Sequence, residues 1–257
     1  QGTLEREDGT LSGRVSAQDI DAGLLSTLTN MSADLKGTLN LDAQLGGTIE
    51  NPAADISIDV INGGVGMATF DSLTVLTNLK NGIITVDQAL MKKGEYKASA
   101  YGIIPLKALQ SKPWEMPDDY EQIQLQIGLD HADLSILPLL SKDVDWGIGP
   151  LSGRILITGT LAHPFFNGGI QTSGGALKLK ALKNPLQDID VDIAFKNEQM
   201  LVNKFSGSMG GGTYNLTGST LITGGGFAEY NFQLNVDKLG VDCDFYQGPL
   251  TGQLILG

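Results

Sequence analysis

Alternation of apolar and polar residues is the dominant pattern of this 257-residue chain. It is clearest in residues 122–130, QIQLQIGLD, where an isoleucine or leucine takes every second position. The same alternation runs through residues 39–45, 188–195 and 230–237. A period of two places successive side chains on opposite faces of a β-strand. Because strands of a parallel sheet are buried on both faces and apolar throughout, the pattern predicts a mostly antiparallel sheet with one apolar and one polar face.

Glycine-rich segments separate the alternating runs. The chain has 34 glycines and no Gly-x-y period, which indicates turns, bulges and bends rather than collagen. At 8–12 residues for a strand and its turn, we expect roughly 17–20 strands. Two segments predict short helices instead, Asp21–Met31 and His131–Ser141, the second interrupted by Pro138. The prolines and mixed charge of Gln110–Glu121 predict a loop between units.

A short phrase of the sequence occurs three times, as Leu35-Lys36-Gly37, Leu151-Ser152-Gly153 and Leu250-Thr251-Gly252, each followed by an apolar run. Its glycines are 116 residues apart (37 to 153) and then 99 (153 to 252). Such repeats indicate an architecture of stacked units. We therefore expect a segment of a longer repeat protein. The expected divisions are the end of a preceding repeat with a short helix in 1–34, a first β-groove repeat with its linker loop in 35–121, a second repeat in 122–249 and the start of a third in 250–257.

The charge balance is acidic, with 29 Asp and Glu against 17 Lys and Arg and a net charge of −12. This argues against a nucleic-acid partner and against binding flat on an anionic membrane surface. The sequence has no run of about 18 apolar residues that could span a bilayer as a helix. Its single cysteine, Cys243, can form neither an internal disulfide nor a cysteine-rich metal site.

Residues suited to catalysis or metal binding are scarce. The two histidines, His131 and His163, stand in different repeats without a neighbouring ligand, and a turn role is favoured for both. The glycine clusters do not match a phosphate-binding loop, and no GxSxG elbow occurs. The carboxylates of Asp188, Asp190 and Asp192 alternate along the polar face of one strand. We therefore expect no enzymatic activity, no catalytic residues, no metal site and no cofactor.

The apolar face is the remaining functional feature, and the pattern allows two interpretations. It could be the core of a filled β-sandwich or the lining of an open groove. Mid-sized aliphatic residues and an aromatic content of only 6% favour the groove. The residues predicted to line it are Leu39, Leu41, Ile56, Ile58, Leu73, Val75, Ile123, Leu125, Ile127, Ile155, Ile157, Ile189, Val191, Ile193, Phe232, Leu234 and Val236.

The pattern L-x-G-x-h-x-h-x-G-T-x-x-x-P, where h is apolar, is carried by Leu151–Pro164 and, with wider spacing, by Leu35–Pro52. Together with the glycine-rich amphipathic strands it resembles the TamB family of AsmA-like, repeating-β-groove proteins. The resemblance implies a mainly β fold: a long, strongly curved, mostly antiparallel sheet that forms an elongated taco-like groove with an apolar lining, plus one short helix per repeat.

The resemblance also implies a function. Such proteins lie in the periplasm of double-membraned bacteria, are anchored in the inner membrane through a helix outside this sequence, and conduct phospholipid acyl chains between the inner and outer membranes. A second role implied for the family is a chaperone or assembly platform for outer-membrane β-barrel proteins, working with a barrel partner of the assembly-machinery type. A third hypothesis, a β-solenoid adhesin, fits less well because solenoid rungs repeat every 20–30 residues or so.

Overall fold

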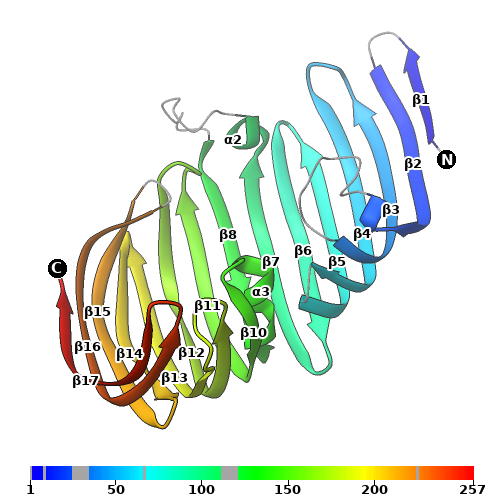
Figure 1. Cartoon of the computed structure of the whole chain (residues 1–257). Helices are drawn as coiled ribbons and strands as arrows, with labels where there is room; N and C mark the ends of the chain where they lie inside the picture. Colours follow the sequence, from blue (N-terminus) through cyan, green and yellow to red (C-terminus); the bar gives the residue numbers. More distant parts are fainter. Residues whose placement is uncertain (1, 8–9, 25–34, 66–67, 111–120, 224–225) are drawn as a thin grey trace. The chain divides into compact units, whose positions relative to one another are not determined.

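A computed structural model describes the chain except residues 1, 8–9, 25–34, 66–67, 111–120 and 224–225 (Figure 1). It divides into two compact units, residues 1–127 with 158–162, and residues 128–157 with 163–257. Seventeen strands occur in the described residues, and the strands within each unit pair antiparallel with their neighbours. The mainly β, antiparallel fold class predicted from the alternation is therefore confirmed.

The first unit is a meander in which each strand from β1 to β7 pairs with the next along the chain. Its elements are β1 (Gly2–Glu7), β2 (Thr10–Asp21), β3 (Leu35–Gly47), β4 (Pro52–Val65), β5 (Ala68–Lys80), β6 (Ile83–Lys93), β7 (Tyr96–Pro105), the short helix α2 (Leu106–Gln110) and β8 (Ile123–Gly128). Because every connection joins neighbouring strands, the alternation seen in the sequence places one set of side chains on a common face.

The second unit repeats this plan, with β12 to β17 again pairing in chain order. Its elements are β9 (Ala132–Asp133), the 3₁₀ turn η2 (Leu134–Ile136), α3 (Leu137–Leu140), β10 (Val144–Ile148), β11 (Pro150–Gly159), β12 (Pro164–Leu179), β13 (Leu186–Asn197), β14 (Gln199–Met209), β15 (Gly212–Thr223), β16 (Gly226–Cys243) and β17 (Tyr246–Leu256). Strand β10 pairs with the second half of β12, and β9 pairs with the start of β11.

The helix predicted over His131–Ser141 is present in a shorter form, as η2 and α3 with Pro138 in the first turn of α3. Asp133 explains where it begins. This side chain is 4% exposed and accepts bonds from the Ser135 amide at 2.8 Å and the Gly149 amide at 2.9 Å. An N-cap that also holds a neighbouring strand fixes the turn against the sheet.

Two other sequence predictions fall largely on residues that the structure does not describe. For the predicted helix Asp21–Met31, Asp21 is the last residue of β2 and the chain turns helical at Gly23 and Leu24, whereas residues 25–34 are outside the described part. In the predicted loop Gln110–Glu121, Gln110 belongs to α2, and residues 111–120 are likewise outside it.

The strands of both units are curved (Figure 1), and β-bulges interrupt their register. The β2–β3 register shifts between Ala17 and Ile20, next to Asp19, whose φ is 55°. The β16–β17 register shifts between Val236 and Leu239, where Lys238 has a φ of 48°. An extra residue on one strand kinks it and increases the local twist. Curvature is therefore built into the strands themselves.

The bulge at Lys238 turns the end of β16 toward the β12–β13 connection, although β14 and β15 lie between these strands in the sheet. The Lys183 amide donates to the Asp242 carbonyl at 2.8 Å, and the two side chains form an ion pair at 2.8 Å. The Asn184 side chain donates to the Gly240 carbonyl at 3.1 Å. One end of the second unit is therefore closed by its own strands.

Close approach of two backbones explains the glycine at position 102. Gly102 has a φ of +146°, and a Cβ placed there would collide with the carbonyl oxygen of Gln124 on β8. We expect Gly102→Ala to lower the free energy of unfolding by about 2 kcal/mol, because both the φ and the contact oppose a side chain. The control is Gly46→Ala, where a Cβ meets nothing within 4 Å. Equal stability of the two variants in urea unfolding would contradict this packing.

Candidate functional site: the apolar face of each unit

In the first unit, strand register aligns apolar side chains in rows that cross six strands, β2 to β7. Residues directly opposite each other in an antiparallel pair point to the same face, so the register defines that face. The central rows are Ala17, Leu41, Ile58, Val75, Ala89, Ala100 and Ile20, Leu39, Val60, Leu73, Met91, Ala98. The flanking rows are Val15, Ala43, Ile56, Thr77, Val86, Gly102 and Gly13, Leu45, Ala54, Leu79, Ile84, Ile104.

The opposite face of this unit carries cross-strand polar contacts. Thr74 donates its hydroxyl to Asp59 at 2.7 Å, and an Arg14–Asp42 ion pair of 2.8 Å joins β2 to β3. Apolar side chains also occur there and are exposed, such as Leu76 at 37% and Tyr101 at 48%. Solvated polar pairs of this kind contribute little stability but keep one side of the sheet wet. The two faces thus differ in chemistry, as the alternation predicts.

Six of the predicted lining residues lie together on this apolar face, on three adjacent strands: Leu39, Leu41, Ile56, Ile58, Leu73 and Val75. Leu39 is 8% exposed, and the other five are half-buried. On β8, Ile123, Leu125 and Ile127 alternate along one side of the strand; Ile123 is buried at 4% exposure, and the other two are half-buried. Mid-strand leucines and isoleucines packed under a second layer would be fully buried. This face is therefore incompletely covered.

The second unit has the same arrangement. Register connects Val191 on β13 through Phe205 and Leu216 to Leu234 on β16. A parallel row joins Ile193 through Val202 and Gly218 to Phe232 on β16. The predicted lining residues on β11, Ile155 and Ile157, occupy alternate positions and are half-buried. Val236 on β16 is half-buried as well.

One part of this face is a packed core. The buried cluster comprises Leu186, Ile189, Met209, Tyr214 and Leu239. Ile189 is 2% exposed, and Val191, Leu234 and Val236 pack against the cluster. Four predicted lining residues therefore belong to this core or touch it, whereas Ile193 and Phe232 are only partly covered. The two interpretations of the alternation apply to different stretches of the same strands.

Tyr214 lies in this core with a polar atom that finds no partner among the described residues. Its ring meets Phe205 edge-on at 5.4 Å between centroids, and its hydroxyl is buried without a hydrogen bond. Burial raises the pKa of Tyr214 from 10.0 to about 12. A buried hydroxyl without a partner opposes folding by about 1 kcal/mol or more.

We therefore expect Tyr214→Phe to raise the free energy of unfolding by about 1 kcal/mol. The raised pKa also predicts a pH dependence. Above pH 10 the unfolded chain loses the phenolic proton while the folded chain keeps it, so wild-type stability falls between pH 10 and about 12. The loss from this group approaches about 3 kcal/mol. Urea titrations of both proteins from pH 8 to 12 measure it. An identical alkaline decline in the variant would contradict this assignment.

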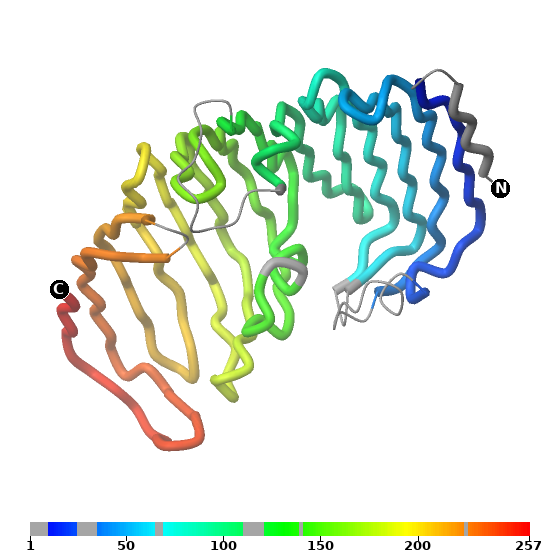
Figure 2. Tube along the Cα trace, turned by 90° about the horizontal axis from the view of Figure 1, so that it is seen from above, coloured from blue at the N-terminus to red at the C-terminus, as the bar shows by residue number. Residues whose placement is uncertain are grey.

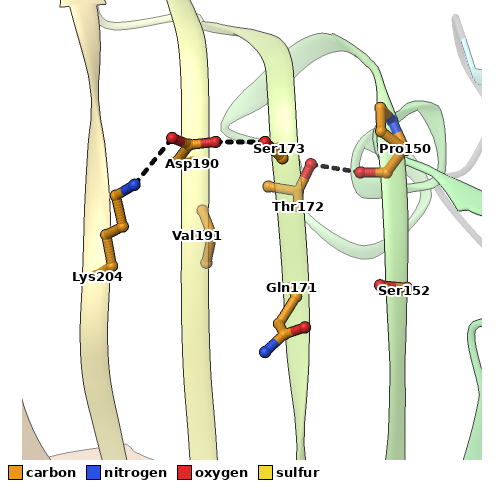
Figure 3. A pocket seen from close by; sticks show the side chains of 8 residues that line it. All are labelled: Pro150, Ser152, Gln171, Thr172, Ser173, Asp190, Val191 and Lys204. Atoms are coloured by element: carbon orange, nitrogen blue, oxygen red, sulfur yellow. Dashed lines mark hydrogen bonds and ion pairs between the residues drawn. The ribbon is translucent and has the colours of Figure 1, made fainter.

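A pocket of about 400 Å³ lies beside β11, β12, β13 and β14 of the second unit (Figure 3). It is lined by Pro150, Ser152, Gln171, Thr172, Ser173, Asp190, Val191 and Lys204. Asp190 is the hub of this pocket, with Lys204 at 2.9 Å on one oxygen and the Ser173 hydroxyl at 2.7 Å on the other. Thr172 donates its hydroxyl to the Pro150 carbonyl.

Both oxygens of the Asp190 carboxylate have a polar partner. The hydrogen bond from Lys204, and then that from Ser173, holds the pKa of Asp190 below its ordinary value. A general acid or base needs a pKa moved toward neutrality, which is the opposite direction. The Ser173–Asp190–Lys204 group is best described as a cross-strand polar contact.

Both histidines lie in turns, as predicted. His131 is exposed, has a φ of 57° and lies in the turn between β8 and β9. His163 is exposed and precedes Pro164 between β11 and β12. Cys243 is a buried free thiol. In the described part of the chain, no group of three or more His, Cys, Asp or Glu side chains could hold a metal ion.

Sequence reasoning missed part of the apolar face, on β6 and β7. Met91, Ala89, Val86 and Ile84 share the face, but a register shift between Val86 and Ala89 breaks the period of two. On β7 the corresponding residues are mostly small, such as Ala100. The sequences of β6 and β7 therefore show no regular alternation when each is considered alone. A shift of one position within an otherwise alternating run is the signal that could have revealed the bulge.

Comparisons of the chain with protein-family models, with curated proteins and with solved structures give no match. Among the described residues, none of the helices has the length and apolar character needed to cross a membrane.

Proposed function

We propose that the chain is a segment of a periplasmic apolar groove that conducts phospholipid between the inner and outer membranes, as in the TamB-like proteins that its repeats resemble. The observation that carries the proposal is the set of half-buried apolar rows across β2 to β7. The rows contain one polar side chain, Thr77, whose hydroxyl donates to the Thr85 carbonyl, and the remaining apolar surface is suited to hydrocarbon rather than to a polar metabolite.

The dimensions of this face suit an acyl chain. Six strands about 4.8 Å apart span about 24 Å along the rows. Four rows two residues apart span about 20 Å along the strands. One leaflet contributes about 15 Å to the hydrocarbon core of a bilayer. The face of the first unit is therefore long enough for one extended acyl chain and wide enough for two side by side.

The energy scale supports holding lipid while letting it slide. A buried methylene contributes about 0.8 kcal/mol, so ten methylenes with half their surface covered contribute about 4 kcal/mol per chain. Release into water is then strongly opposed. A shift from Leu41 to Ile58 or Val75 exchanges one aliphatic contact for another and changes the energy little. The head group needs no site of its own, because it can remain in solvent at the margin.

The proposed function implies a cellular location and a partner. The parent protein is anchored in the inner membrane of a double-membraned bacterium, and the chain lies in its periplasm. It works with an outer-membrane barrel protein of the assembly-machinery type. It has no enzymatic activity and requires no cofactor.

A second candidate function is an assembly platform for outer-membrane β-barrel proteins. The observation that favours it is the apolar exposure of β10, where Trp146 is 39% and Ile148 is 62% exposed. Exposed apolar side chains of this kind can pack on a client strand. Crosslinks from β10 to unfolded barrel polypeptides, in a chain that carries no lipid, would favour this function over lipid conduction.

Native mass spectrometry of the purified chain tests lipid conduction at its first step. We expect co-purified phospholipid, and we expect the delipidated chain to bind a phospholipid with a fluorescent acyl chain. A soluble head-group analogue without acyl chains is the matched control and should not compete. A folded chain that carries no phospholipid and binds none when it is offered would contradict the proposal.

A further inference from the structure

The end of β16 extends beyond its neighbour β15. Pairing between the two strands ends at Thr213 and Asp237, whereas β16 continues to Cys243, past the tip of the β14–β15 hairpin (Figure 2). The bulge at Lys238 bends this end, and the Lys238 amide donates to the Thr251 hydroxyl at 2.8 Å. We call residues 239–243 the strap. They remain paired with β17 but have left β15.

The strap crosses the β14–β15 hairpin at two glycines. Gly210 lies in the turn of this hairpin, and a Cβ placed on Gly240 of the strap would lie 2.8 Å from the Cα of Gly210. Because neither residue has a side chain, the two backbones can pass in direct contact. Beyond the hairpin the strap meets the β12–β13 connection at Lys183 and Asn184. It therefore joins two segments that are not neighbours in the sheet.

Apolar side chains lie under the strap. Leu239 of the strap is 8% exposed and belongs to the buried cluster, and Val241 packs against that cluster. Leu182 of the β12–β13 connection packs against it as well. Along β13, Ile189 in the cluster is 2% exposed, whereas Ile193 is half-buried. The apolar face of this strand therefore changes from fully covered to partly covered within four residues.

Few polar contacts hold the strap on the β12–β13 connection. In the described residues these are the backbone bond from Lys183 to Asp242, the bond from the Asn184 side chain to Gly240, and the Lys183–Asp242 ion pair. The Lys183 side chain is 65% exposed, and exposed ion pairs contribute little stability. A segment held by so few bonds opens at a lower free-energy cost than the paired strands around it.

The closed arrangement also leaves one polar group unsatisfied. The Tyr214 hydroxyl is buried in the cluster with Leu239 and has no hydrogen-bond partner among the described residues. Such a hydroxyl opposes the arrangement that buries it, and it gains a partner when water or the ester group of a lipid reaches it. Opening of the strap therefore removes a cost of the closed state.

We propose that the buried cluster is a second acyl-chain site and that the strap is its gate, hinged at the bulge of Lys238. In the closed state Leu239 and Val241 occupy the apolar surface. When the strap moves away, this surface continues the rows of Val191 and Ile193 and receives the tail of a phospholipid. The inference rests on the proposed function, and it adds that this part of the second unit takes up lipid only while the strap is open.

The test locks the strap with a disulfide. Lys183→Cys and Asp242→Cys are combined with Cys243→Ser, which removes the native thiol. The backbone bond and the ion pair between residues 183 and 242 show that their side chains are within reach of a disulfide. The whole delipidated chain, oxidised or reduced, is incubated with vesicles of a phospholipid that carries a photoreactive acyl chain. Mass spectrometry then assigns the adducts to β3–β5 of the first unit or to β13–β15 of the second.

The reduced chain should give adducts on both units. In the oxidised chain, adducts on β13–β15 should fall at least about tenfold, because lipid binds only the open state, and those on β3–β5 should not change. Equal second-unit labelling of the two forms would overturn the inference. Labelling of the first unit alone in the reduced chain would overturn it and leave the proposed function intact. Labelling of neither unit would overturn both.

A second variant tests the gate without new cysteines. Asn184→Ala removes one bond to the strap and should raise second-unit labelling about threefold, with first-unit labelling unchanged. The matched control is Lys204→Ala, which removes an ion pair of 2.9 Å to Asp190 that does not involve the strap, and it should label as the wild type does. Thermal unfolding verifies that both variants are folded. A folded Asn184→Ala chain labelled as the wild type would overturn the inference.

Discussion

Ile58→Arg is expected to weaken phospholipid binding by the isolated chain about fiftyfold. Ile58 lies in the centre of a row on the apolar face, between Leu41 and Val75, and is half-buried. A guanidinium there displaces acyl chain from the row. Loss of contact with about six half-covered methylenes removes about 2.4 kcal/mol, which corresponds to this factor. Titration of the delipidated chain with a fluorescent phospholipid measures the change.

The matched control is Ser57→Arg, one residue away on β4. Ser57 points to the polar face and is paired with Asp42, so an arginine there has an acidic neighbour and touches no lipid. It should bind phospholipid as the wild type does. Thermal unfolding of both variants separates loss of binding from loss of structure. Comparable weakening by the two substitutions, or normal binding by a folded Ile58→Arg chain, would contradict the assignment of the lining.

The second large effect is expected at Ile189, in the packed part of the second unit. Ile189→Ala should lower the free energy of unfolding by about 3–4 kcal/mol, because this side chain is 2% exposed within the core cluster and its removal leaves a cavity. Ile193→Ala, four residues further along the same strand, should lower it by about 1 kcal/mol, because Ile193 is half-buried.

Urea unfolding of both alanine variants measures this contrast, which separates the filled from the uncovered part of one strand. The same variants also distinguish the contribution of the apolar face to lipid binding from its contribution to stability. Ile193→Ala should weaken lipid binding modestly in a stable protein, whereas Ile189→Ala should affect stability first. Losses of equal size at the two positions would mean that β13 is packed evenly along its length, as in a sandwich.

Alternation was sufficient to predict the fold class, because a period of two is a direct consequence of strand geometry. The residues 122–130 and 188–195 predicted strands, and the structure has β8 and β13 there. The repeated L-x-G phrase marked equivalent strands, β3, β11 and β17. Both features depend on local sequence, so they could be read without knowledge of distant contacts.

Properties that depend on distant parts of the chain could not be read in this way. The core around Ile189 forms because a bulge at Lys238 bends β16 toward the β12–β13 connection, about fifty residues earlier in the sequence. A bulge also shifts the alternation of β6, and for this reason the sequence pattern did not predict Met91 as a lining residue. Local periodicity states which side chains share a face. It does not state whether another strand covers that face.

The most direct test of lipid binding by the apolar face is site-specific photocrosslinking at two adjacent positions of β5. A photoreactive amino acid at Val75 lies on the apolar face of the first unit, and one at Leu76 lies on the polar face, although both native side chains are apolar. In the folded chain loaded with phospholipid, we expect lipid adducts at position 75 and none above background at position 76. Equal labelling at the two positions, or labelling at position 76 alone, would contradict it.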